Sequence, residues 1–267
     1  MQYITSSNNR LIVRIKALKM RKYREKYRLF FTEGLKFVME GIESGSHIVH
    51  IVISNSFFES EYYANYSNRL NNSNAILYMV PDQLFREISD TENPQGILAV
   101  AEIPQYEISS ILHEDSLVVV LDEIQDPGNL GTILRTAHAA GFDAAIVLKG
   151  SVDAYNPKTI RSSAGSIFHI PVISCHDTRE CMECLKEKGI RIYGTHIGAE
   201  KNHYQVRLDK GAAILIGNEA RGLSEEIIKY VDETIKIPMP GGAESLNASV
   251  AAGIVIYESV RQRYHNS

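Results

Sequence analysis

Long apolar runs are missing from this chain of 267 residues, and their absence excludes one class of protein. No stretch approaches the roughly 20 consecutive apolar residues that a membrane-spanning helix requires, so we expect no membrane partner. Residues 1–10, MQYITSSNNR, also lack the apolar segment of a secretory signal. The expected location is therefore the cytoplasm.

Cysteine is scarce as well, with three residues in the whole chain. An odd number in a chain of this size argues for a reducing cytoplasm. Cys181 and Cys184 form a CxxC pair, and Cys175 beside His176 raises the alternative of a zinc site. However, there is no second CxxC, and apolar residues at helical spacing put the pair within one helix. We therefore expect thiols in the core or on the surface, and no metal.

The charges are unevenly distributed along the chain. Residues 1–36 hold ten basic and two acidic residues, a net charge of +8, which leaves −12 for the rest. A basic segment on an acidic body is typical of a protein that binds a polyanion such as RNA. The expected RNA-binding residues are Arg10, Arg14, Lys19, Arg21, Lys22 and Arg24.

Aromatic residues lie among these charges and could stack on unpaired bases. They are Tyr3, Tyr23, Tyr27, Phe30 and Phe31. The alternative is a solvated amphipathic helix whose apolar residues, such as Leu11, Ile15 and Leu18, face inward, because charge runs are usually solvated faces.

The pattern of apolar residues predicts two α/β segments. Residues 1–105 read as a small unit in which strands and helices alternate, and residues 104–116 read as a linker. From residue 115 to 267, short apolar runs alternate with helical patterns, as in an open parallel sheet covered on both faces. The expected strands there are LVVVLD, AAIVLKG, IPVIS, IRIYGTHI, AAILIG and ETIKIPM.

The turn after the first of these strands, DPGNLGT, first suggests a nucleotide-binding loop. A dinucleotide fingerprint needs GxGxxG directly after the strand, but here Gly128 and Gly131 lie three residues apart behind a proline. A phosphate-binding loop needs Gly-Lys followed by Ser or Thr, which the chain lacks. Instead, Asn129 stands near the helix start and Arg135 six residues later. Arg135 either serves a site or extends its charge into solvent.

Two later segments place polar residues where ligands bind in open α/β sheets. The buried run ILIG ends in Asn218 and Glu219, at the carboxyl end of a strand. Ser245 and Asn247 open a final helix rich in Ala, Ser and Gly, where free backbone amides permit close approach of a ligand. The alternatives are a capped turn with a surface ion pair and a tightly packed helix.

Together and in this order, the three segments resemble the SpoU (TrmH-like) RNA 2′-O-ribose methyltransferases of the SPOUT class. The match covers about residues 115–260 and rests on Asn129, Gly131 and Arg135; on Gly217, Asn218 and Glu219; and on Ser245, Leu246, Asn247, Ser249 and Ala251. The first hundred residues resemble the ribosomal-protein-L30e-like substrate-binding domain often fused to it. The segments that carry this likeness are FTEGLKFVMEGIESG and NPQGILAVAEI.

The resemblance implies a trefoil-knotted α/β domain over residues 115–267, an L30e-like domain over residues 1–105, and a homodimer. It implies S-adenosylmethionine as methyl donor and a ribose 2′-hydroxyl as acceptor, without a metal. The implied cofactor-binding residues are Thr195, Ile216, Gly217, Asn218, Ile237, Pro238, Met239 and Leu246. The implied catalytic residues are Asn129, Arg135, Glu219, Ser245 and Asn247.

The substrate expected from this layout is rRNA, with 23S rRNA ahead of tRNA. Two readings from other classes stay open at this point. One is a catalytically silent RNA-binding protein on the same scaffold, although the intact motif residues speak against it. The other is a dinucleotide-dependent oxidoreductase, which the missing fingerprint disfavours.

Overall fold

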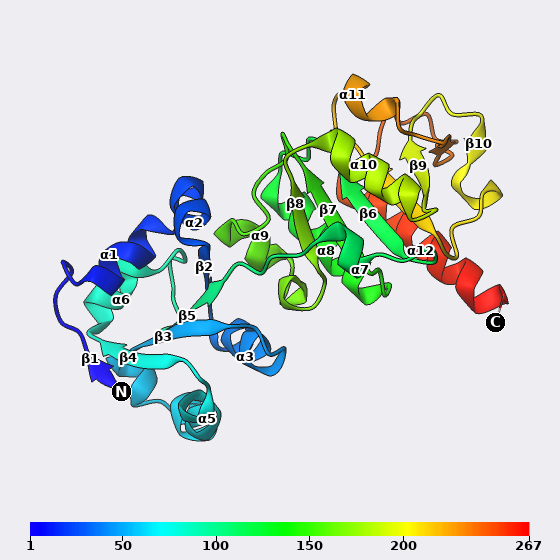
Figure 1. The fold of residues 1–267 in the computed structure, drawn as a ribbon. Helices are drawn as coiled ribbons and strands as arrows, with labels where there is room; N and C mark the ends of the chain where they lie inside the picture. The colour runs from blue at the N-terminus through cyan, green and yellow to red at the C-terminus, as the bar shows by residue number, and fades with distance from the viewer. Residues whose placement is uncertain (267) are drawn as a thin grey trace. The chain divides into compact units, whose positions relative to one another are not determined.

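The computed structural model describes residues 1–266, which form two compact units (Figure 1). The first unit comprises Met1–Pro104 together with Tyr155–Arg161, and the second comprises Gln105–Ala154 and the chain from Ser162 onward. Tyr155–Arg161 thus groups with the N-terminal residues, although it lies in the chain between two strands of the C-terminal sheet. None of the helices that residues 1–266 form combines the length and the apolar composition of a membrane span.

The first unit is a five-stranded sheet in the order β1-β4-β3-β5-β2, with helices on both faces. β1, β3 and β4 run parallel, whereas β5 pairs antiparallel with β3 and with β2. Its elements are β1 (Gln2–Tyr3), α1 (Arg10–Ala17), α2 (Arg21–Tyr27), β2 (Leu29–Glu33), α3 (Leu35–Glu43), β3 (Ile48–Ser54), α4 (Asn55–Phe58), α5 (Glu61–Asn72), β4 (Ile76–Val80), α6 (Asp82–Ile88) and β5 (Ile97–Glu102).

The basic N-terminal segment forms two short helices, α1 and α2, and not one continuous helix. Asn9 caps α1 by accepting a hydrogen bond from the backbone N–H of Leu11 at 2.9 Å. The apolar face of α1 is fully buried, since Ile12, Ile15 and Leu18 are each 0% exposed. α1 therefore anchors to the sheet through one face and leaves its charged face in solvent.

Three expectations for this segment are wrong. Arg24 is 2% exposed, and its Nη1 donates to the carbonyl oxygen of Leu18 at 2.7 Å, so it ties α2 to the end of α1 and is not accessible to RNA. Phe30 and Phe31 are each 2% exposed, because every residue of β2 is buried. Neither ring can stack on a base.

The second unit is a seven-stranded parallel sheet in the order β10-β12-β9-β11-β6-β7-β8. All six expected strands are present, and β10 is an addition. The elements of the second unit are α7 (Ile108–Ile111), β6 (Leu117–Leu121), α8 (Pro127–Ala139), β7 (Ala144–Leu148), η1 (Ser166–Phe168), β8 (Val172–Cys175), α10 (Thr178–Glu187), β9 (Arg191–Thr195), β10 (Lys201–Asn202), η2 (His203–Gln205), β11 (Ala212–Ile216), α11 (Glu225–Ile228), β12 (Glu233–Lys236) and α12 (Ala248–Asn266). Between β7 and η1 lies α9 (Pro157–Ser162), which groups with the first unit except for its last residue.

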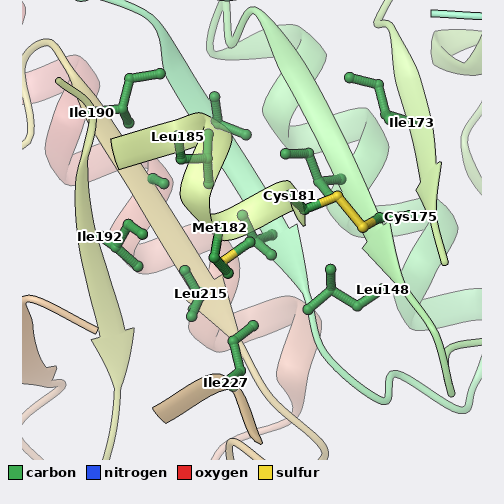
Figure 2. Close-up of a cluster of buried hydrophobic side chains, with 14 of the residues drawn as sticks. Leu148, Ile173, Cys175, Cys181, Met182, Leu185, Ile190, Ile192, Leu215 and Ile227 are labelled. Atoms are coloured by element: carbon green, nitrogen blue, oxygen red, sulfur yellow. A yellow bond between two sulfur atoms is a disulfide. The ribbon is translucent and has the colours of Figure 1, made fainter. Parts of the chain in front are cut away.

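Helices cover both faces of this sheet, as its continuous apolar strands predicted. On one face, α10 and α11 pack through Met182, Leu185 and Ile227 onto alternate strand residues such as Ile192 and Leu215 (Figure 2). On the other face, α8 and α12 pack against each other and contact β7 and β11. The expected α/β class is confirmed, and the expected threading of the chain into a knot stays a prediction.

The segment expected as a linker, residues 104–116, contains the short helix α7. Its Ile108 and Ile111 pack against the core cluster beneath α10, so part of this connection belongs to the second unit. The periodicity of this stretch was too weak to indicate a helix of four residues.

The expectation of free thiols is wrong for two of the three cysteines. Cys175 at the end of β8 and Cys181 in the first half of α10 form a disulfide, with 6.6 Å between their Cα atoms (Figure 2). Asp177 caps α10 through a hydrogen bond from the backbone N–H of Glu180, and this sharp strand-to-helix turn brings the two cysteines together. Cys184 is free and, as expected, shares α10 with Cys181.

Candidate active site

A pocket of about 490 Å³ lies beyond the carboxyl ends of β9, β11 and β12, three adjacent parallel strands. This is the edge of an open α/β sheet where ligands bind. Among the residues expected to bind the cofactor or the substrate, nine line it: Thr195, Ile216, Gly217, Asn218, Glu219, Ile237, Met239, Ser245 and Leu246. Pro238, which was also expected, is exposed and does not belong to the lining.

The loop after β11 is a tight turn that requires two glycines. The backbone N–H groups of Asn218 and Gly222 each donate to the other's carbonyl oxygen at 2.9 Å. Gly222 has φ +74°, the left-handed region that favours glycine. A Cβ on Gly217 would lie 2.4 Å from the carbonyl carbon and oxygen of Gly222, so no side chain fits there.

The side chain of Asn218 completes this loop. Its Nδ2 donates to the carbonyl oxygen of Glu123 at 3.0 Å, and its Oδ1 accepts from the backbone N–H groups of Ala220 and Arg221 at 2.9 and 3.1 Å. The amide of Asn218 therefore holds the shape of a loop that lines the pocket.

The same loop is anchored to β6 through Asp122, a carboxyl group that is 3% exposed. Its Oδ2 accepts a hydrogen bond from the backbone N–H of Ser224 at 2.7 Å, and Ser224 in turn caps α11. Burial raises the pKa of Asp122 above its ordinary value of 3.8, and the hydrogen bond from Ser224 opposes that shift. This hydrogen bond thus joins the end of β6 to the end of the loop that carries Asn218 and Glu219.

A chain of hydrogen bonds joins side chains from all three motifs at the pocket rim. Asn129, in the first turn of α8, donates through Nδ2 to Oε1 of Glu219 at 2.6 Å. Asn247 donates through Nδ2 to Oδ1 of Asn129 at 3.0 Å. The Oδ1 of Asn247 accepts from Oγ of Ser249 at 2.6 Å, which completes the chain. Asn129 and Asn247, which are 118 positions apart in sequence, are therefore in direct contact.

Arg135 stands apart from this group. It is exposed on α8, it is absent from the pocket lining, and it makes no hydrogen bond or ion pair with any residue from 1 to 266. Within one chain the structure brings together four of the five expected catalytic residues, since Ser245 lines the pocket beside the hydrogen-bonded group. Arg135 lies outside it.

Sequence reasoning missed several lining residues, among them His196, Ile197, Arg221 and Glu244. Ile197 is 63% exposed, and it lies two residues beyond the end of β9. The rule that ligands sit at the carboxyl ends of strands could have found it, because Thr195 was already expected there. Over residues 1–266, no cluster of His, Cys, Asp and Glu side chains is suited to hold a metal ion.

Comparison with family models matches both parts of the chain. Residues 116–257 match the SpoU rRNA Methylase family, and residues 9–99 match an MRM3-like substrate binding domain. The chain belongs to the SpoU rRNA methylase family. The match over residues 116–257 includes the three motifs and the pocket, and the match over residues 9–99 includes the basic helices α1 and α2.

Curated relatives agree with this assignment. A 23S rRNA (guanosine(2553)-2′-O)-methyltransferase, RlmP from Bacillus subtilis, is 33% identical over 96% of this chain and 98% of its own length. A 23S rRNA (uridine(2479)-2′-O)-methyltransferase from Streptomyces viridochromogenes is 37% identical over 69% of this chain and 67% of its own length.

Solved structures of methyltransferases share the fold over nearly the whole chain. The SpoU methyltransferase AviRb from Streptomyces viridochromogenes, in complex with AdoMet, has a TM-score of 0.89 and 30% identity, covering 96% of this chain and 99% of that one. An AdoMet-bound rRNA methyltransferase from Sinorhizobium meliloti has a TM-score of 0.87 and 28% identity, covering 98% of both chains.

The buried carboxyl of Asp122 makes stability depend on pH. Because its pKa is raised in the folded protein, the unfolded chain loses this proton first, and the free energy of unfolding falls as pH rises from 3.8 through the folded pKa. Asp122→Asn removes this titration but keeps an acceptor for Ser224. We expect wild type to lose stability relative to the variant as pH rises through this window, measured by urea unfolding. A difference that stays constant over pH would contradict the burial effect.

Proposed function

We propose that this protein is an S-adenosylmethionine-dependent methyltransferase that modifies a ribose 2′-hydroxyl of 23S rRNA. The observation that carries the proposal is the hydrogen-bonded chain Glu219–Asn129–Asn247 beside the pocket. It unites all three motifs of a SpoU enzyme, and two curated relatives act on ribose hydroxyls of 23S rRNA. Ribosomal RNA as substrate also supports the expected cytoplasmic location.

The pocket fits S-adenosylmethionine by size and by chemistry. Its volume of about 490 Å³ is within the range of about 300–1,000 Å³ that small-molecule sites occupy. Apolar side chains such as Ile216, Ile237 and Leu246 suit a purine ring and the methylene groups of the methionine part, and backbone groups of the turn at Gly217 can bond polar edges. When bound, S-adenosylmethionine supplies an electrophilic methyl carbon on a sulfonium centre.

The remaining catalytic task is to position the ribose oxygen and to favour loss of its proton. Near-attack placement alone can lower a barrier by about 7–11 kcal/mol at best. We assign Asn129 and Asn247 to orienting the ribose and the carboxylate of Glu219 to fixing Asn129. A guanidinium keeps its charge at neutral pH, so we assign Arg135 to holding the hydroxyl and an adjacent phosphate through its planar fork.

A homodimer would bring Arg135 close to an active site. α12 exposes Val250 (50%), Ile254 (36%) and Tyr257 (50%), spaced four and three residues apart like a helix-pairing seam. α8 lies alongside α12, with Thr136 next to Gly253, so Arg135 is one residue from a contact between the two helices. A second copy docked there would cover the seam, and we propose that it brings Arg135 to a site shared by two chains.

The N-terminal unit is proposed to select the RNA. Of the expected contacts, Arg10, Arg14, Arg21 and Lys22 are exposed on α1 and α2. Lys19 is half-buried, and its Nζ donates to the carbonyl oxygen of Ser89, so its contribution is smaller. Arg24 is excluded by its burial.

Gly217 tests whether the pocket binds the methyl donor. Gly217→Ala places a methyl group against the backbone of Gly222 and must displace the turn, so we expect S-adenosylmethionine to bind at least tenfold more weakly, about 1.4 kcal/mol. The matched control is Gly241→Ala, since a Cβ there meets nothing within 4 Å. Isothermal titration calorimetry measures both, and equal affinities for the two variants would count against this pocket.

The reaction itself is tested by methyl transfer from labelled S-adenosylmethionine to 23S rRNA stripped of its modifications. We expect one ribose 2′-O-methyl group, located by its resistance to alkaline cleavage, and its loss with Asn129→Ala. Transfer to tRNA alone would support the alternative substrate. Tight cofactor binding with no transfer to any RNA would instead support a silent RNA-binding protein.

A further inference from the structure

Two tyrosine rings lie in near-parallel planes on the solvent side of α2. Tyr23 and Tyr27 are four residues apart, so they share one face of the helix. Their ring centroids are 6.1 Å apart with an angle of 13° between the planes. Tyr27 is 36% exposed and Tyr23 is half-buried, so the pair is held in place and still reachable.

Three cationic side chains lie over these rings. Lys22 Nζ is 4.8 Å from the centroid of Tyr23. Arg14 Cζ, from α1, is 5.2 Å from the centroid of Tyr27, and Lys26 Nζ is 5.6 Å from the same centroid. We refer to Arg14, Lys22, Tyr23, Lys26 and Tyr27 as the tyrosine–cation cluster. Each of the two rings therefore has a positive charge beside it.

The charge of the cluster is not neutralised by the protein. Over residues 1–266, Arg14, Lys22 and Lys26 form no ion pair with a carboxylate, and neither do the nearby Arg10 and Arg28. Other cations of these helices are paired, since Lys16 contacts Glu87 at 2.6 Å and Arg21 contacts Glu25 at 2.7 Å. The uncompensated charge thus concentrates at the two stacked rings.

We infer that the tyrosine–cation cluster binds two successive unpaired nucleotides of RNA, with bases on the tyrosine rings and phosphates on the cations. This inference rests on the proposed function for the identity of the polymer. A nucleotide carries a flat aromatic ring and an anion together, and the cluster offers a partner for each. An acidic peptide or an anionic membrane would pair with the cations but would offer no flat base to stack on the tyrosine rings. Paired bases are hidden within a helix, so the bound segment is single-stranded.

The ring contribution is tested by replacing both tyrosines. The probe is a fluorescent 12-nucleotide unpaired RNA of mixed sequence, and its affinity is measured by fluorescence anisotropy. The affinity of an RNA duplex of equal length is measured separately for comparison. Stacking one base contributes about 5- to 150-fold to affinity, so we expect Tyr23→Leu with Tyr27→Leu to weaken single-strand binding at least tenfold. Tyr23→Phe with Tyr27→Phe keeps both rings and should stay within twofold of wild type. Tyr62→Leu, at a 65% exposed tyrosine on α5, is the matched control.

The charge contribution is tested through salt dependence. For single strands, each phosphate contact adds about 0.7 to the slope of log affinity against log salt. Replacing Arg14, Lys22 and Lys26 by Gln should therefore lower that slope by about 2. Arg69→Gln is the control, because Arg69 is an exposed cation 5.9 Å from the ring of Tyr66 but is paired with Glu43. Its slope should match that of wild type.

Methyl transfer to 23S rRNA and the thermal unfolding midpoint are measured on the same preparations. If the leucine variant folds and binds the single strand as wild type does, the inference is overturned, even when methyl transfer is intact. Equal binding of duplex and single strand, or an equal loss in the phenylalanine variant, would overturn it as well. If wild type transfers no methyl group but the leucine variant alone loses strand binding, the proposed function fails and the inference stands.

Discussion

The candidate site depends on one interaction, the hydrogen bond from the amide of Asn129 to the carboxylate of Glu219. Asn129 lies in the first turn of α8, which follows β6, and Glu219 lies in the loop that follows β11. Asn247 extends the bond to the start of α12. A charge-assisted bond of this kind, at 2.6 Å, is stronger than a neutral one, so the three motifs behave as a single polar unit.

The parallel sheet makes this meeting possible. β6 and β11 are parallel neighbours, so the segments that follow them, α8 with Asn129 and the loop with Glu219, begin at the same edge of the sheet. Asp122 then joins the end of β6 to Ser224, which keeps the second loop close to the first. Gly217 allows the backbone of Gly222 to approach closely, and the tight turn that results forms part of the pocket lining.

Much of this could be predicted from the sequence, and the failures have physical causes. Continuous apolar runs identified the strands of the parallel sheet, and three spaced motifs identified the family. Burial of Arg24, Phe30 and Phe31 could not be predicted, because a local pattern does not reveal which neighbours cover a residue. The Cys175–Cys181 disulfide depends on the turn at Asp177, and the solvent-facing position of Arg135 depends on the packing of α8 on α12. Both are tertiary effects.

The central claim is that the three motifs act as one unit in methyl transfer. The most direct measurement is a double-mutant cycle in kcat/KM for 23S rRNA, with Asn129→Ala, Glu219→Ala and the double variant. Because the two side chains are bonded, we predict that the double variant loses less than the sum of the single losses, with a coupling energy of about 0.5–3 kcal/mol. Strictly additive losses would show that the two residues act independently and would contradict the account.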